Sequence, residues 1–282
     1  MATPLSSGQA LRAAKSTGHR VVQLSGWATH NRNHKGAWGP ANGVMVHHTG
    51  SDTSAPAAYA TNVLHDGYSG LPGPLCQFGI DADGVIYMIG WGRANHAGRG
   101  DDAVLDRVMK EDPRLMDAEA RPVRRGTDGN PRFYGIEVMY SGGHRMTGPQ
   151  RDSTESLAAA LCRAHGWGAA SVIAHREWST TKWDPGQESM VTMRRNIAAR
   201  LQIGDVDMAS SEEIAGAILR ATVTHPTTGE EVTIREALRM GLVGKIEAAE
   251  ANAGVRVVRA DVGELTGAVS ALVVALGKAE TL

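Results

Sequence analysis

Three short stretches of the chain combine histidine and carboxylate side chains in ways that could do chemistry. In the first, the apolar residues 44–46 lead into the histidine pair His47 and His48. In the second, an apolar stretch leads into His175, and Asp184 follows after a loop of eight residues, just before a proline. Zinc accepts both imidazole nitrogen and carboxylate oxygen, and a loop lets two residues converge on one ion. These residues could form a metal site, but neither segment establishes one by itself, and a histidine pair is more often structural or incidental.

The geometry of a strand limits how much of the histidine pair one site can use. Because side chains alternate between the two faces of a strand, His47 and His48 must face opposite ways. At most one of them can therefore bind a given ion. The chain contains no HExxH motif, which excludes the commonest helical zinc arrangement.

The third stretch is residues 133–139, where Glu137 interrupts a run of mostly apolar residues. Burying a carboxylate costs free energy unless the group has a partner or a task. Two interpretations follow. The residue is either an edge-strand glutamate that faces water, or a general base whose pKa is raised toward neutrality by its surroundings.

Alternating strands and helices are expected to position these residues in an α/β or α+β domain of about 200 residues. The predicted strands cover residues 43–48, 77–80, 85–88, 134–139 and 171–174. A turn at residues 81–84 predicts a hairpin between the second and third of them. The predicted helices cover residues 55–66, 153–165 and 186–202, the second of them capped by Ser153 and ended by Gly166.

Taken together and in their order, four motifs resemble the type-2 N-acetylmuramoyl-L-alanine amidase family, which includes the peptidoglycan recognition proteins and many bacteriophage endolysins. They are VMVHHTG (44–50), GRANHAG (92–98), YGIEV (134–138) and AHREWSTTKWDPG (174–186). The motifs span about half of the chain. The resemblance implies an α/β fold, with a central mixed β-sheet flanked by helices and a zinc ion in a groove on one side.

The resemblance also implies roles for individual residues. His47, His175 and Asp184 would bind one Zn²⁺ ion, which leaves the fourth position open for water, as in catalytic zinc sites. Glu137 would be the general base, at a position where other members carry tyrosine. Lys182 would face the developing oxyanion.

Further histidines and tryptophans are assigned in the same way. His96 matches a family histidine near the substrate groove, which implies substrate binding, and His48 would point away from the metal as a structural neighbour. Trp91, Trp178 and Trp183 could either stack on sugar rings in the groove or pack in the core.

The implied activity is zinc-dependent hydrolysis of the amide bond between N-acetylmuramic acid and L-alanine in bacterial peptidoglycan. Two alternatives stay open: a recognition module that binds peptidoglycan without cutting it, and a zinc peptidase that cuts within the stem peptide. Residues 99–133 are longer than a minimal family member needs. They are expected to form a functional or mobile loop that contacts the stem peptide or the glycan.

Composition excludes several other classes of protein. The 282 residues are 42% apolar and carry a net charge of −1, which is typical of a globular chain. No apolar run approaches the roughly 20 residues of a membrane-spanning helix, and the N-terminal residues lack the apolar core of a secretory signal. We expect no membrane or nucleic-acid partner, synthesis in a host cytoplasm, and action on the cell wall after membrane permeabilisation, as for a phage endolysin. Cys76 and Cys162 are expected to be buried and unpaired.

The composition changes at residues 205–211, which predicts a linker between a zinc amidase catalytic domain (1–204) and a small helical module (212–282). The formal charge is +4 before residue 205 and −5 from there on, and the basic part suits a polyanionic substrate. Capping boxes predict helices from about 211 and 234.

Apolar residues within 255–276 follow the 3-4 spacing of a coiled coil. They favour either a homo-oligomer through this seam or a helix that packs on its own module, which would serve oligomerisation or cell-wall attachment.

Overall fold

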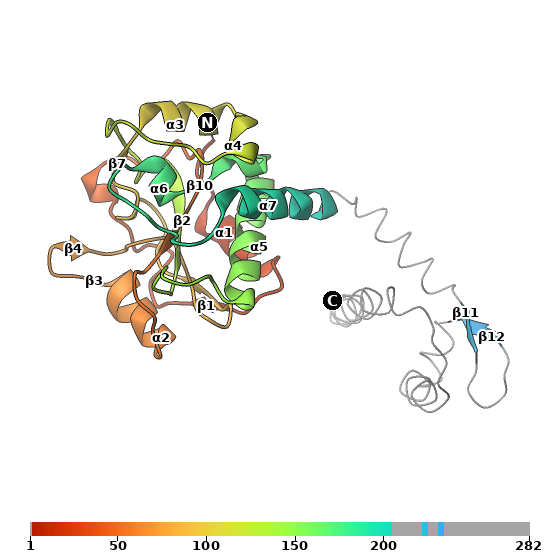
Figure 1. The fold of residues 1–282 in the computed structure, drawn as a ribbon. Helices are drawn as coiled ribbons and strands as arrows, with labels where there is room; N and C mark the ends of the chain where they lie inside the picture. Colours follow the sequence, from red (N-terminus) through yellow and green to blue (C-terminus); the bar gives the residue numbers. More distant parts are fainter. Residues whose placement is uncertain (1, 205–221, 225–230, 234–282) are drawn as a thin grey trace. The chain divides into compact units, whose positions relative to one another are not determined.

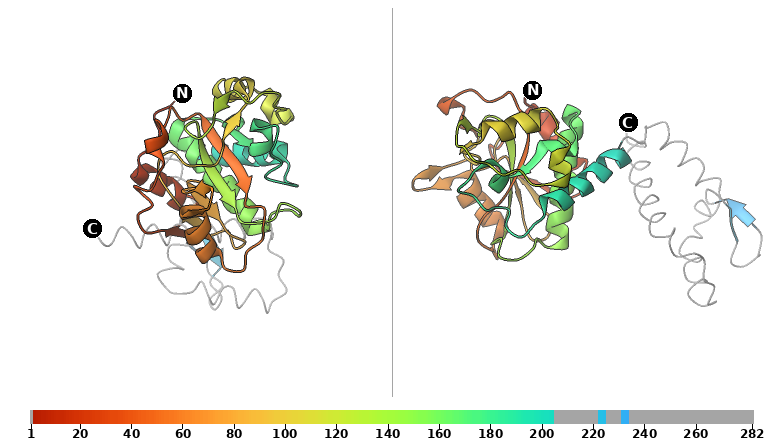
Figure 2. Two further views of the ribbon diagram at one scale, coloured as in Figure 1. Left: turned by 90° about the vertical axis from the view of Figure 1, so that its left-hand side faces the viewer. Right: turned by 45° about the horizontal axis from the view of Figure 1, so that its top comes forward.

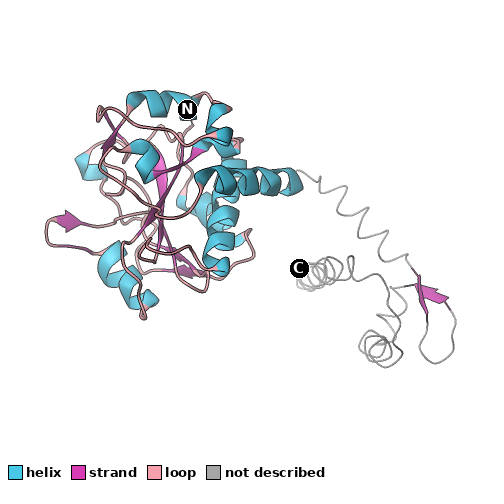
Figure 3. Cartoon of the chain, viewed as in Figure 1, coloured by secondary structure: helices cyan, strands magenta, loops and turns pink. Residues whose placement is uncertain are grey.

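The computed structural model describes residues 2–204 and two short segments, 222–224 and 231–233. A six-stranded mixed sheet forms the centre of the first part (Figures 1 and 3). In spatial order the strands are β1 (Val21–Gln23), β6 (Ile86–Met88), β5 (Phe78–Ile80), β9 (Phe133–Val138), β2 (Gly43–His48) and β10 (Val172–Ala174). Only the β5–β6 pair is antiparallel within this sheet. The predicted mixed sheet is therefore confirmed.

Helices cover both faces of this sheet, which explains why its central strands read as continuous apolar runs. Val44 and Val46 of β2 lie in the cluster under α1 (Ser7–Lys15), α5 (Gly148–His165) and α7 (Met190–Gly204). Met45 lies on the opposite face, with α3 (Asp102–Met109) and α4 (Arg114–Asp117). All three side chains are fully buried. Figure 2 shows the sheet between these two layers.

The five predicted strands are confirmed to within a residue at each end, but two helix starts were wrong. Helix α5 begins at Gly148 because Thr147 and Gln150 form its capping box, so the predicted cap Ser153 is buried inside the helix. Gly166 ends this helix in the left-handed conformation, as predicted. Helix α7 begins at Met190, four residues later than predicted, because residues 186–189 form the end of the loop that precedes it.

The predicted helix 55–66 is present in two parts, α2 (Pro56–Tyr59) and the π-helix η2 (Ala60–His65). A two-stranded hairpin follows, formed by β3 (Gly67–Tyr68) and β4 (Leu71–Pro72). π-Helices are rare and occur often at functional sites. Val63 and Leu64 of this one line the groove described below.

Residues 99–133, which were expected to form a functional or mobile loop, contain regular secondary structure. They contain α3, α4 and a short antiparallel pair, β7 (Arg99–Gly100) with β8 (Thr127–Asp128). Val104, Val108 and Leu115 are buried in the core on the sheet face that carries Met45. Asp101 caps α3 by accepting a hydrogen bond from the backbone of Ala103.

Several short elements were missed. The N-terminal helix α1 is capped by Ser6 and Gln9, an S-x-x-Q pattern that could have revealed it. Strand β1 and the 3₁₀-helices η1 (Asn33–Lys35) and η3 (Ala169–Ser171) are three residues long, and the single-turn helix α6 (His175–Trp178) has four. Elements of this length carry too little periodicity to be predicted. Both cysteines are buried and unpaired, as expected.

The chain divides into two units, Met1–Asp205 and Val206–Leu282. The predicted linker 205–211 and the heptad stretch 255–276 lie outside the described residues. In the second unit the structure describes the antiparallel strands β11 (Thr222–Thr224) and β12 (Glu231–Thr233), which were not predicted. None of the helices in the described part is both long and apolar enough to cross a membrane.

Candidate metal centre

Strand alternation brings the candidate residues to one face of the sheet. His47 follows Met45 by two positions in β2, so it lies on the same face as Met45 and opposite to Val46. Strand β9 runs beside β2 in parallel, and its register places Glu137 directly opposite His47. On the other side of β2, strand β10 ends at Ala174, and His175 begins the helical turn α6.

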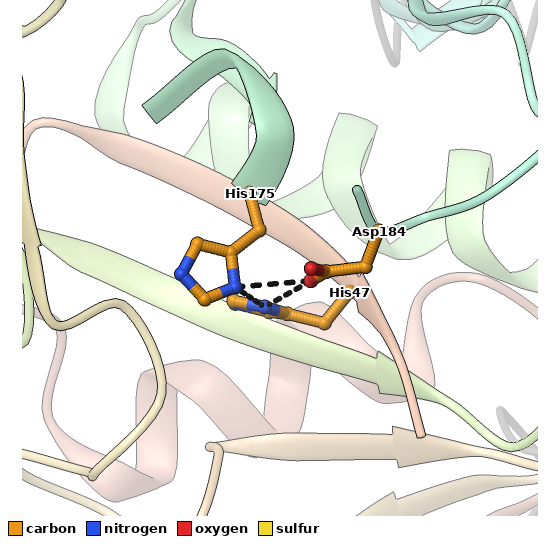
Figure 4. Close-up of side chains that lie close together, drawn as sticks. All are labelled: His47, His175 and Asp184. Atoms are coloured by element: carbon orange, nitrogen blue, oxygen red, sulfur yellow. Dashed lines mark hydrogen bonds and ion pairs between the residues drawn. The ribbon is translucent and has the colours of Figure 1, made fainter. Parts of the chain in front are cut away.

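The side chains of His47, His175 and Asp184 converge at this point (Figure 4). The Nδ1 atoms of the two imidazoles lie 3.0 Å apart, and each lies 3.0 Å from Oδ2 of Asp184. The three residues are 1%, 3% and 7% exposed. They could together hold one metal ion.

Asp184 reaches the two histidines because Arg176 fastens its loop to α6. The backbone N–H of Arg176 donates to the carbonyl oxygen of Asp184 at 3.0 Å. Its guanidinium donates to the carbonyl oxygens of Gly186 and Glu188 and forms an ion pair with Glu119 at 2.7 Å. Sequence reasoning missed this role of Arg176, and no motif besides its position after His175 pointed to it.

The donor atoms suit a cation. Nε2 of His175 lies 3.0 Å from the carbonyl oxygen of Ala97, which can only accept, so Nε2 carries a proton, and the neutral form of the ring would present a lone pair at Nδ1. Burial raises the pKa of Asp184, but its contacts with His175 and His47 outweigh this and hold it below its ordinary value. An ionised carboxylate oxygen and an imidazole lone pair 3.0 Å apart repel each other unless a proton or a metal cation lies between them. In tetrahedral zinc sites the ligand atoms lie about 3.3–3.6 Å apart, close to the spacing seen here.

His47 is also suited to bind a cation. Burial lowers its pKa to about 4, the nearby His175 acts in the same direction, and Asp184 opposes them only in part. The ring is therefore neutral near pH 7, and metal binding does not have to displace a second proton.

Glu137 stands beside this group without belonging to it. Its Oε1 lies 4.0 Å from Nδ1 of His47, and its side chain is 15% exposed. The other oxygen, Oε2, is buried and has no hydrogen-bond partner among the described residues. Burial raises the pKa of Glu137 well above its ordinary value, and the charge of Asp184 adds to this while Lys182 opposes it. An edge-strand glutamate facing water is thus excluded, because β9 lies between β5 and β2.

The metal candidates form the floor of an open groove of about 480 Å³. Lys182 is exposed on its wall, and His96 is a buried part of its lining. Two aromatic side chains in the lining are largely exposed: Tyr68 at 59% and Trp183 at 56%. An exposed aromatic ring in a groove is a typical contact surface for a ligand.

Trp91, Trp178 and Trp183 differ clearly in their exposure to solvent. Trp91 is 5% exposed and Trp178 is fully buried, so both pack in the core. Trp183 instead lies against the ring of His48, with ring centroids 4.3 Å apart. His48 contacts Tyr140 as well and does not join the candidate metal ligands, although it reaches the edge of the groove.

A family model described as N-acetylmuramoyl-L-alanine amidase matches residues 37–187 of the chain. No curated protein sequence matches significantly. Similar solved structures include the endolysin amidase LysCS from Clostridium intestinale URNW, with 18% identity, a TM-score of 0.40, and coverage of 65% of this chain and 95% of that chain. A mutant endolysin from Bacillus subtilis has 19% identity, a TM-score of 0.43, and coverage of 64% and 99%. Drosophila PGRP-LB has 18% identity, a TM-score of 0.40, and coverage of 68% and 95%.

Proposed function

The chain belongs to the N-acetylmuramoyl-L-alanine amidase family, and from this premise we propose that it hydrolyses the amide bond between N-acetylmuramic acid and L-alanine in bacterial peptidoglycan with the help of one Zn²⁺ ion. The observation that carries the proposal is the convergence of His47, His175 and Asp184 beside Glu137 at the floor of an open groove. This set combines three metal ligands with a separate carboxylate, as amide hydrolysis requires.

His47 and His175 would hold the ion through Nδ1, and Asp184 through a carboxylate oxygen. Bound zinc supplies a Lewis acid that polarises the scissile carbonyl and makes water acidic enough to lose its proton near neutral pH.

Glu137 takes the proton of the attacking water and returns it to the nitrogen of the leaving L-alanine. Its buried position supports this role, because a carboxylate with a raised pKa binds a proton more readily near neutral pH. The ammonium group of Lys182 stands on the groove wall, where it offsets the negative charge that develops on the carbonyl oxygen.

The exposed rings of Trp183 and Tyr68 serve as contact surfaces for the substrate, and the apolar face of a sugar ring is the part of peptidoglycan that suits them. The biological role that we propose is that of a phage endolysin, made in the host cytoplasm and acting on the wall after membrane permeabilisation. The support for this role is the motif resemblance to a family that includes many such enzymes.

Mass spectrometry of digested peptidoglycan tests the proposal. Purified sacculi are incubated with the zinc-loaded chain, with the chelator-treated chain, and with the Asp184→Ala variant, which lacks one ligand oxygen. We expect free stem peptides with a new L-alanine amino terminus and intact glycan strands in the first sample alone.

Two other outcomes would replace the proposal. Shortened stem peptides that remain attached to muramic acid would keep zinc hydrolysis and move the cut into the stem. Binding to sacculi without any cleavage would indicate a recognition module.

A further inference from the structure

His96 is enclosed by protein on both sides of its ring. The residue is 8% exposed and belongs to the loop GRANHAG, whose backbone is fastened by the side chain of Asn130. Oδ1 of Asn130 accepts hydrogen bonds from the backbone N–H groups of His96 and Ala97, both at 2.9 Å, and of Gly98 at 3.2 Å. The backbone that carries the imidazole is therefore held in place before any substrate binds.

Both ring nitrogens of His96 have protein partners. Nε2 lies 3.2 Å from the carbonyl oxygen of Phe133, and Nδ1 lies 3.0 Å from Nε2 of His47. The carbonyl can only accept, so Nε2 of His96 carries the proton. A neutral imidazole carries a single proton, so with that proton on Nε2 the Nδ1 atom of this buried ring can only accept.

The direction of the second hydrogen bond follows from the first. Since Nδ1 of His96 accepts, Nε2 of His47 must donate. A neutral His47 then has its lone pair on Nδ1, the atom that faces His175 and Asp184. The chain from Phe133 through His96 thus selects the tautomer of His47 that can bind a metal.

Strand β9 makes room for this arrangement. A Cβ atom at Gly135 would lie 2.7 Å from Nδ1 and 2.8 Å from Cγ of His96, much closer than such atoms approach in proteins. The imidazole therefore lies against the bare backbone of Gly135. This glycine lies two residues before Glu137, on the same face of the strand.

We propose that His96 is a positioning residue: seated on Gly135 and held by Phe133, it orients His47 and keeps its Nδ1 lone pair directed at the metal. The inference rests on the proposed function, because it assumes that His47 binds zinc. This role takes the place of the substrate binding that the family resemblance implied for His96, because both of its ring nitrogens already have protein partners. Partners of this kind typically raise metal affinity by 10- to 100-fold.

Zinc affinity of the full chain tests the inference, measured by competition with a chromophoric chelator. His96→Leu removes the acceptor, and His96→Asn keeps an oxygen near the position of Nδ1. We expect His96→Leu to bind zinc about 10- to 100-fold more weakly than the unaltered chain. The affinity of His96→Asn should be close to that of the unaltered chain.

A second pair of variants leaves His96 itself intact. Gly135→Ala should displace the imidazole and weaken zinc binding, whereas Gly143→Ala is a matched control, because a Cβ there meets only Oγ of Ser141 at 3.8 Å. The visible absorption spectrum of the Co²⁺-loaded chain should change with Gly135→Ala and stay unchanged with Gly143→Ala. Thermal unfolding without metal shows whether each variant is folded.

The outcomes separate this inference from the proposed function. If the unaltered chain binds no zinc, the proposed function fails. If it binds zinc and His96→Leu and Gly135→Ala bind equally well, only the positioning role is overturned. In the unaltered chain, ¹⁵N NMR of the histidine side chains should find the proton of His96 on Nε2, and a proton on Nδ1 would also overturn the inference.

Discussion

The carboxyl group of Glu137 is costly to keep where it is. One of its oxygens is buried without a hydrogen-bond partner among the described residues, and the group lies next to the charge of Asp184. Natural proteins seldom leave a buried polar atom in this state without a function. A role as proton acceptor would explain why the carboxyl group of Glu137 is kept in this unfavourable position.

The Glu137→Gln variant tests that role. The amide has nearly the same size and cannot accept the proton from water, so we expect hydrolysis of peptidoglycan to fall by about 10²- to 10⁴-fold. Zinc content and thermal unfolding should stay close to those of the unaltered chain, because Glu137 is not among the three candidate ligands. Undiminished turnover would place the base elsewhere.

Trp183 and Trp178 have the same side chain and opposite surroundings. Trp183 is 56% exposed in the groove, and Trp178 is fully buried under α3 and against Phe133. We expect Trp183→Ala to weaken binding to sacculi in a sedimentation assay and to leave unfolding almost unchanged. Trp178→Ala should instead cost about 3–5 kcal/mol of stability. Unchanged binding by Trp183→Ala would remove this residue from the substrate surface.

At the scale of elements, one buried ion pair ties together the parts that carry the site. Glu177 of α6 and Arg194 of α7 are both fully buried and lie 2.9 Å apart. Glu177 also accepts hydrogen bonds from the backbone of Ala120 and Ala174, and Arg194 donates to the carbonyl oxygen of Val172. The pair thereby joins α7 to the strand end from which His175 projects.

Breaking this pair should be costly, because the remaining charge would be buried without a partner. We expect Arg194→Met to lower the free energy of unfolding by about 3–5 kcal/mol. The adjacent Arg195 is a matched control, since its side chain is 64% exposed and pairs with Asp117 only at 3.6 Å, so Arg195→Met should cost less than about 1 kcal/mol. Urea denaturation measures both values, and equal losses would contradict the prediction.

The N-terminal segment is joined to β9 and α5 through a titratable group. Tyr134 accepts a hydrogen bond from the backbone of Leu5, and its hydroxyl lies 2.8 Å from Nε2 of His165. Burial lowers the pKa of His165 to about 4. The ring is therefore neutral near pH 7, and its Nε2 accepts a hydrogen bond from the hydroxyl group of Tyr134.

Acid should weaken this junction. Between about pH 6.5 and pH 4 the unfolded chain binds a proton at His165 that the folded chain does not, so the free energy of unfolding falls as the pH falls. The slope for one such group is at most about 1.4 kcal/mol per pH unit. We expect His165→Gln, which does not titrate, to lose less stability between pH 7 and pH 5 in urea denaturation. Parallel losses in the two proteins would contradict this role.

At the scale of the whole molecule, the heptad pattern of residues 255–276 leads to a prediction about assembly. We propose that the chain self-associates through this seam, whose apolar residues include Leu265. Analytical ultracentrifugation at tens of micromolar should show an oligomer for the unaltered chain and a monomer for Leu265→Asp. A strictly monomeric unaltered chain would rule out the seam.

The candidate site and the family match both lie on one side of the division at residue 205. All the candidate site residues, and the whole of the family match at 37–187, lie within the first unit, Met1–Asp205. That residues 1–204 act as the catalytic domain and residues 212–282 serve oligomerisation or wall attachment remains our proposal.

The sequence by itself predicted the features that depend on local pattern. Apolar runs located five of the six strands of the central sheet to within a residue, because strands that are buried on both faces consist mostly of apolar residues. The strict alternation of a strand already separated His47 from His48. Errors arose where local signals compete: Thr147 capped α5 in place of Ser153, and residues 99–133 formed helices whose apolar faces are short.

Tertiary structure alone decided what depends on which segments become neighbours. Sequence spacing could not show that the register of β2 and β9 sets Glu137 opposite His47, or that Arg176 draws Asp184 toward His175. It could not distinguish an exposed Trp183 from a buried Trp178, because exposure is a property of the packed surroundings and not of the residue. The proton positions on the histidines likewise follow from hydrogen-bond partners far apart in the chain, and folding alone brings those partners within reach.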